Sequence, residues 1–195
     1  MTSAPMSPVP VAVFAVKQRF TAMVNRYEVL PADANGDPTG PMFAFAQQKR
    51  MKLKEEVIFY GDDSKTVPVF SFKARNVMDI RGVTDIFDPQ GNAIGMFSKD
   101  FKASLLRSTW LVSAAGGAQM RGQERSQFVA LLRRFSDVTF IPYHFDFARA
   151  DGAVAFSVEK KWGLRDRYTI TVWDASLDWR VVSAMAVALD ALQAR

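Results

Sequence analysis

The sequence has no cysteine and a single histidine, His144, among its 195 residues. Without cysteine the chain has no disulfide, thiolate nucleophile, zinc finger or cysteine-bound iron–sulfur cluster. One histidine also excludes sites that need two imidazoles, such as HExxH zinc sites and two-histidine iron sites. We expect neither a bound metal nor a cofactor.

Long apolar runs are also missing. The stretch from Val181 to Leu189 carries no charge, but a membrane-spanning helix needs about 20 apolar residues. We therefore expect no transmembrane span and a cytoplasmic location, peripheral to the inner membrane face if the protein meets a membrane.

We do not expect the first residues to form a secretory signal. Three prolines interrupt them, and no basic residue precedes Lys17. We expect residues 1–10 to be a flexible arm and residues 11–195 to be a single domain. The hydrophobic content of 49% and charged content of 23% are ordinary for a globular domain. The net charge of +5 favours anionic partners, such as phospholipid or nucleic acid.

Most of the chain has the alternating pattern of short β-strands. Phe70 and Phe72 fall on one face of such a strand, for example, and Ser71 falls on the other. The sequence Asp88-Pro-Gln-Gly fits a type I turn, and Asp151-Gly is typical of a hairpin. Strands at this spacing predict an antiparallel sandwich or barrel.

Two segments have helical spacing instead. Residues 123–135 place large apolar side chains at i, i+3, i+4 and i+7, which predicts one extra amphipathic helix on the surface. The C-terminal stretch is apolar on all sides, so it must be surrounded by protein. We expect a buried C-terminal helix enclosed by a β-barrel, with Asp178 or Ser176 capping its start. The predicted core positions of this helix are Val181, Val182, Met185, Leu189 and Leu192.

Several segments, in this order, resemble one known group of proteins. They are FAFAQQKRMKLKEEVIFY, the F-D-x-x-G-N-x-I-G hairpin from Phe87 to Gly95, FSVEKKW, RDRYTITV and a terminal LDWRVVSAMAVALDAL. The sequence resembles the LURP-one-related and phospholipid scramblase-like branch of the tubby C-terminal-like superfamily, over roughly Val13 to Ala194. The resemblance implies a mainly β fold: a closed antiparallel barrel of about twelve strands around the buried C-terminal helix.

The resemblance implies a non-enzymatic domain that binds anionic phospholipid or phosphoinositide headgroups peripherally. Two clusters of cations are the candidate headgroup contacts, although cations at strand edges also serve simply to prevent edge-to-edge pairing. The first cluster is Lys49, Arg50, Lys52 and Lys54, and the second is Lys160, Lys161, Arg165 and Arg167.

Two alternatives remain open. The domain could be a protein-interaction scaffold without a lipid role, or an uncharacterised hydrolase that uses carboxylates. His144 and Asp146 share a strand face and could act as acid and base, but no nucleophile motif accompanies them. We therefore predict no catalytic residues and interpret this pair as structural.

Calcium and nucleic acid are not expected partners. The loop from Asp33 to Asp37 begins like a calcium loop but lacks the glycine and glutamate positions of an EF-hand, so we interpret it as a plain turn. Asp174, Asp178 and Asp190 lie where scramblases carry a calcium segment, but they form no continuous ligand loop. The four tryptophans fit a barrel core or rim better than base-stacking positions.

Overall fold

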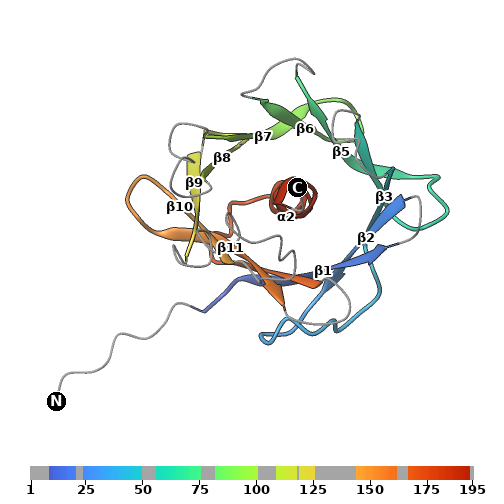
Figure 1. The fold of residues 1–195 in the computed structure, drawn as a ribbon, viewed down its shortest axis with the longest axis horizontal. Helices are drawn as coiled ribbons and strands as arrows, with labels where there is room; N and C mark the ends of the chain where they lie inside the picture. The colour runs from blue at the N-terminus through green and yellow to red at the C-terminus, as the bar shows by residue number, and fades with distance from the viewer. Residues whose placement is uncertain are drawn as a thin grey trace.

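Twelve antiparallel strands close into a barrel around one helix (Figure 1). The computed structural model describes residues 9–20, 24–49, 56–75, 82–100, 109–117, 119–125, 144–161 and 167–193. The strands are β1 (Ala12–Phe20), β2 (Val24–Pro31), β3 (Ala44–Lys49), β4 (Val57–Tyr60), β5 (Pro68–Ala74), β6 (Thr84–Phe87), β7 (Ala93–Lys99), β8 (Thr109–Ala114), β9 (Gln119–Glu124), β10 (His144–Ala148), β11 (Val154–Lys161) and β12 (Arg167–Val172).

The strands follow one another around the barrel in chain order, and the last strand closes it. β12 pairs with both β11 and β1, with Ala12 opposite Val172 and Lys17 opposite Arg167. Local turns set the hairpins, as at Asp88, whose carboxylate accepts the N–H groups of Gln90 and Asn92. The prediction of a closed, mainly β barrel is confirmed.

Helix α2 (Trp179–Gln193) runs through the centre of the ring (Figure 1). Asp178 caps its start, because the Asp178 carboxylate accepts the N–H of Arg180 at 2.8 Å and its carbonyl accepts that of Val181 at 3.0 Å. Every residue from position 181 to position 190 is buried. The predicted central helix is therefore confirmed, although the side chain of Leu192 lies outside the described residues.

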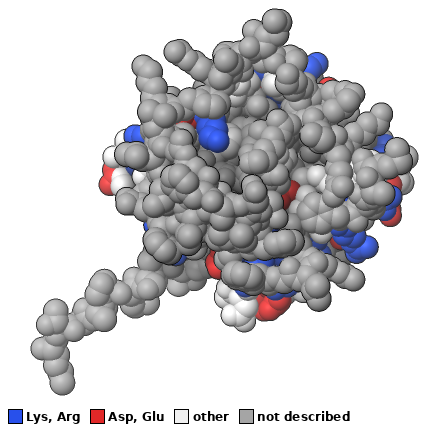
Figure 2. Space-filling model, viewed as in Figure 1, with Lys and Arg blue, Asp and Glu red and all other residues white. Residues whose placement is uncertain are grey.

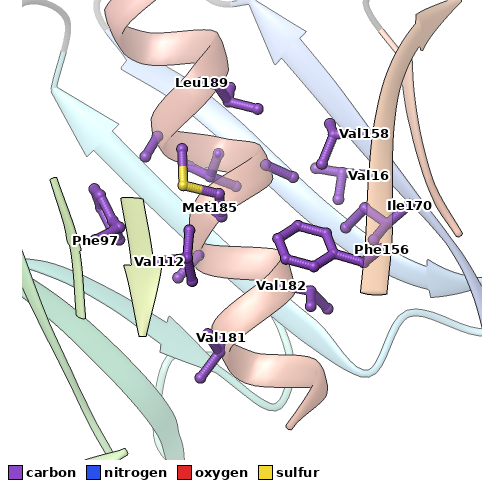
Figure 3. Packing of buried hydrophobic residues seen from close by; sticks show 14 of the residues in the cluster. Val16, Phe97, Val112, Phe156, Val158, Ile170, Val181, Val182, Met185 and Leu189 are labelled. Carbon is purple, nitrogen blue, oxygen red and sulfur yellow. The ribbon is translucent and has the colours of Figure 1, made fainter. Parts of the chain in front are cut away.

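The barrel wall packs directly on the helix (Figure 3). Met185, Val182 and Leu189 are 0% exposed and lie among wall residues such as Phe156 and Val158. A single glycine makes one of the close approaches possible. A Cβ on Gly95 of β7 would lie 3.0 Å from the Val181 side chain and 2.9 Å from the Ser113 carbonyl oxygen.

The two ends of the barrel interior differ in chemistry. Around the start of α2, aromatic rings fill the lumen: Trp179 packs edge-on against Phe43 at 4.9 Å and Phe70 at 5.6 Å between ring centroids. Near the other end of α2 the interior is polar, because Asp190 accepts hydrogen bonds from the hydroxyls of Tyr27 and Tyr168. The helix thus has an apolar anchor at its start and a hydrogen-bonded one near its end.

The predicted surface helix at residues 123–135 is not confirmed. Gln123 and Glu124 belong to β9, where Gln123 pairs with Thr109 and Glu124 pairs with Phe145. Cross-strand pairing outweighs the helical preference of these two residues, and the Glu124 side chain is 1% exposed. Residues 126–135 lie outside the described residues.

Among the described residues, α2 is too short to cross a membrane, and no other helix qualifies.

Candidate functional site

Three cations form a row across the outer face of β11, β12 and β1. Lys161 lies opposite Arg167, and Arg167 lies opposite Lys17. Residues directly opposite in an antiparallel sheet point to the same face. Their face is the outer one, because Val16 and Gln18, the neighbours of Lys17, are buried inside the barrel.

Two more cations extend this row along the next pair of strands. Arg19 of β1 lies opposite Arg26 of β2, and both are exposed on the same outer face as Lys17. Three carboxylates accompany the five cations, and the third is Glu159, exposed on the same face two residues before Lys161. Acidic and basic side chains also lie beside one another elsewhere on the described surface (Figure 2). Arg19 pairs with Glu28 at 3.0 Å, and Arg167 pairs with Asp37 at 2.7 Å. We call this surface the basic face; it consists of Lys17, Arg19, Arg26, Lys161 and Arg167.

The structure divides the second predicted cation cluster. Lys161 and Arg167 belong to the basic face, but Lys160 lies opposite Tyr168, whose side chain is 0% exposed inside the barrel. The Lys160 ammonium accordingly sits 5.7 Å from the centroid of the Tyr168 ring. Alternation along β11 therefore separates Lys160 from Lys161, and the two do not form one patch.

The first predicted cluster is mostly beyond what the structure describes. Lys49 is the last residue of β3, and its side chain is not described. Arg50, Lys52, Lys54 and, from the second cluster, Arg165 lie outside the described residues. Their role in binding stays a prediction.

A short loop crosses the outer face of β12 beside the basic face. We call residues 33–37 the strap. Asp33 holds it as a turn, since its carboxylate accepts the N–H groups of Asn35 and Asp37, each at 2.9 Å. Gly36 has a φ of 76° and packs so closely that a Cβ there would lie 2.2 Å from the Thr169 hydroxyl oxygen. The strap therefore requires glycine at this position.

The strap contacts two cations of the basic face. Its Asp37 carboxylate pairs with Arg167, and the Lys161 ammonium donates a hydrogen bond to the carbonyl oxygen of Asn35. Lys17 lies directly opposite Glu28 of β2, but among the described residues Glu28 forms its ion pair with Arg19 instead. The prediction of a plain turn at Asp33–Asp37 gave the local shape but missed these contacts, which join residues more than 120 positions apart.

The inner face of the same strands carries a buried polar network. Tyr27 donates to Asp190 at 2.9 Å and accepts a hydrogen bond from the Gln18 amide at 3.2 Å. Burial and the adjacent Asp190 carboxylate raise the pKa of Tyr27 well above its usual range. The network fixes α2 along and around the barrel axis, and its tyrosine stays protonated under ordinary conditions.

The aspartates of the C-terminal region serve separate structural roles. Asp174 accepts from Ser176 and pairs with Arg149, Asp178 caps α2, and Asp190 binds the two tyrosines. Asp178 and Asp190 are twelve residues apart on the helix, which is about 18 Å at the usual rise per residue. They do not converge on one site.

His144 and Asp146 lie together on β10, but a cation occupies the carboxylate. Arg125 donates two hydrogen bonds of 2.8 Å to Asp146, and His144 lies 3.2 Å from it. Burial acts to raise the pKa of Asp146, but the neighbouring His144 ring and the two hydrogen bonds from Arg125 prevail and lower it to about 2. A carboxylate with so low a pKa is a weak general base. This geometry favours the structural interpretation of the pair.

An outer groove of about 230 Å³ contains two other carboxylates, Glu56 and Asp88. Glu56 accepts a hydrogen bond from the Ser71 hydroxyl at 2.8 Å, and Asp88 binds the backbone of its own turn. Hydrogen bonds donated by Asn92 also keep the pKa of Asp88 below its usual value. Both groups are thus engaged in holding local structure.

Comparison with known proteins gives the family. A family model described as LURP-one-related matches residues 42–190. Searches of curated proteins and of solved structures found no match to the chain. The family match includes ten of the twelve strands and most of α2. The chain therefore belongs to the LURP-one-related family, which is part of the tubby-like C-terminal superfamily.

Proposed function

We propose that this LURP-one-related protein is a non-enzymatic, tubby-like module that docks peripherally on membranes rich in anionic phospholipid, through its basic face. The observation that carries the proposal is the row of Lys161, Arg167 and Lys17 on three adjacent strands. Like charges directly opposite each other destabilise a sheet, and an anionic surface relieves that repulsion.

The expected strength of this interaction follows from the charges. The basic face has five cations and is accompanied by three carboxylates, Glu28, Asp37 and Glu159, which leaves a net charge of +2. Neighbouring strands are about 4.8 Å apart, so adjacent cations of the row lie within one Debye length at physiological salt. At about 1 kcal/mol for each net charge near an anionic surface, the basic face contributes about 2 kcal/mol, or about 30-fold in affinity.

Protein interaction is the competing function. Large apolar side chains are exposed on the described part of the chain, but they come from segments all around the barrel. They are Val9, Val11, Val67, Met96, Leu111 and Val154. The basic face is the more specific feature, because its five cations adjoin one another across four consecutive strands.

Flotation with liposomes tests the proposal. Vesicles of phosphatidylcholine with about one third phosphatidylserine are compared with vesicles of phosphatidylcholine alone, at low salt. The triple variant Lys17→Gln, Lys161→Gln, Arg167→Gln should lose most of the binding to anionic vesicles, by about 100-fold, because it removes the row.

A control variant separates the row from overall charge. Lys65→Gln, Lys73→Gln and Arg121→Gln together remove the same charge from exposed positions outside the basic face. This control should bind within about threefold of the unchanged protein. Equal losses in the two triple variants would contradict a specific basic face, and binding to neutral vesicles would favour apolar contact instead.

A further inference from the structure

We propose that the strap is a built-in competitor for the anion: Asp37 and Asn35 occupy positions on Arg167 and Lys161 that the oxygens of an anionic headgroup would take. This inference rests on the proposed function, since it concerns the regulation of the same basic face. Both contacts of the strap with the basic face are made by oxygen atoms of the strap, and one of them belongs to a carboxylate.

The position of these oxygens resembles that of a bound anion. Asp37 approaches Arg167 at 2.7 Å, which is the short distance typical of a charge-assisted hydrogen bond. Asn35 offers its carbonyl oxygen to Lys161, the cation directly opposite Arg167. Two neighbouring cations are thus bridged by one short loop, as a phosphate or carboxylate group of a lipid would bridge them.

The Asp37 side chain is not needed to hold the strap in place. The turn is held by the Asp33 carboxylate and by backbone bonds, including the one from the Gly36 N–H to the Asp33 carbonyl at 2.9 Å. Its attachment to the wall comes from Gly36, which is buried against Thr169. The only hydrogen bond that the described residues give the Asp37 carboxylate is the one from Arg167. A rotation of this side chain would therefore release the cation without removing the strap.

The ion pair is also weak enough to yield to a stronger anion. The side chains of Arg167 and Asp37 are 31% and 58% exposed, and exposed ion pairs contribute little to stability. A charged bilayer presents many anions at once, whereas the strap presents one carboxylate. The strap should therefore set a threshold, so that sparse or single anions compete poorly and dense anionic surfaces displace it.

Removing the charge of Asp37 tests the competition. Asp37→Asn should raise the affinity for phosphatidylserine vesicles about fivefold, the effect of one charge near an anionic surface. Asp63→Asn is the matched control, because it makes the same change in net charge at an exposed carboxylate for which the described residues show no hydrogen bond or ion pair. It should raise the affinity less than twofold.

A double-variant cycle locates the effect. In an Arg167→Gln background, Asp37→Asn should change the affinity less than twofold, because the cation that it releases is gone. Inorganic phosphate at millimolar concentration forms a separate arm. If phosphate displaces the Asp37→Asn protein from the vesicles, the basic face recognises the free anion. If phosphate has no effect, recognition needs the charged membrane surface.

The outcomes separate the two proposals. If all the proteins bind anionic vesicles but Asp37→Asn resembles Asp63→Asn, the competition is wrong and membrane docking stands. If the Asp37→Asn protein binds anionic vesicles and the unchanged protein binds them only weakly, both membrane docking and the competition by the strap are supported. If no variant binds anionic vesicles, both the docking and the competition are wrong.

Discussion

The inner and outer faces of β11, β12 and β1 differ in chemistry, although their residues alternate along the same three strands. Inside, Val16 and Ile170 pack against α2, and Tyr168 binds Asp190. Outside, the next residues along β1 and β12 are the cations Lys17 and Arg167. Burial of the inner side chains stabilises the folded state, whereas the outer side chains keep their charge available for a partner. Changes inside should therefore alter stability, and changes outside should alter binding.

The largest effect is expected from a charge placed inside. Met185→Asp would bury a carboxylate at a position that is 0% exposed and surrounded by apolar side chains. The cost of an unpaired buried charge is comparable to the whole stability of a domain, so the variant should not fold. Circular dichroism measures this directly. Met185→Leu is the control and should cost less than about 1.5 kcal/mol. A soluble Met185→Asp protein with an unchanged melting temperature would contradict the central position of α2.

A smaller effect is expected from the inner polar network. Tyr27→Phe removes a hydrogen bond to Asp190 and should lower the free energy of unfolding by about 1–3 kcal/mol. The folded pKa of Tyr27 lies above its unfolded value of 10.0, so its contribution is present below pH 10 and is lost as the pH rises further.

Denaturant unfolding between pH 8 and pH 11 checks this sign. The stability of the unchanged protein should fall above pH 10 more steeply than that of Tyr27→Phe, by up to about 1.4 kcal/mol per pH unit. Tyr60→Phe serves as the control, since Tyr60 lies on β4 away from the network. Parallel curves for the protein and the Tyr27→Phe variant would mean that Tyr27 does not bind its proton more tightly in the folded state.

An outer ion pair should matter less. Asp146→Asn removes the carboxylate that Arg125 and His144 hold and should cost about 1–2 kcal/mol at neutral pH. The folded pKa of about 2 lies below the ordinary 3.8, so this stability is present above pH 4 and is lost as the pH falls toward 2. Acid titrations of the two proteins should therefore converge. A constant difference down to pH 2 would show that the effect is not due to the charge.

The smallest effect on folding is expected from the basic face itself. Replacing Lys17, Lys161 and Arg167 with glutamine removes the repulsion within the row and the exposed contacts to the strap, which act in opposite directions. The free energy of unfolding should change by less than about 1 kcal/mol, as measured in urea. A large loss would make these cations structural.

Much of the fold could be predicted because its signals are local. The run from Val181 to Leu189 has no charge, so it had to be buried, and the alternation at Phe70 and Phe72 identified an inner strand face. The prediction that a surface helix starts at Gln123 was wrong, because strand pairing with β8 and β10 outweighs the local helical preference.

The candidate site was harder to predict because it depends on register. Lys17 is about 150 positions from Arg167 in the sequence, and only the closure of β12 on β1 brings them together. The pairing of Asp37 with Arg167 is likewise invisible in the local sequence of the strap. The separation of Lys160 from Lys161 could have been predicted from the sequence, since successive residues of a strand point to opposite faces.

The dependence of vesicle binding on salt tests the central claim most directly. The fraction of the unchanged protein that floats with phosphatidylserine vesicles is measured from about 0.05 M to about 0.5 M salt, where the Debye length falls to about 4 Å. Docking through the basic face predicts strong flotation at low salt and nearly none at the upper limit. Flotation that persists at high salt, or that occurs equally with neutral vesicles, would contradict it.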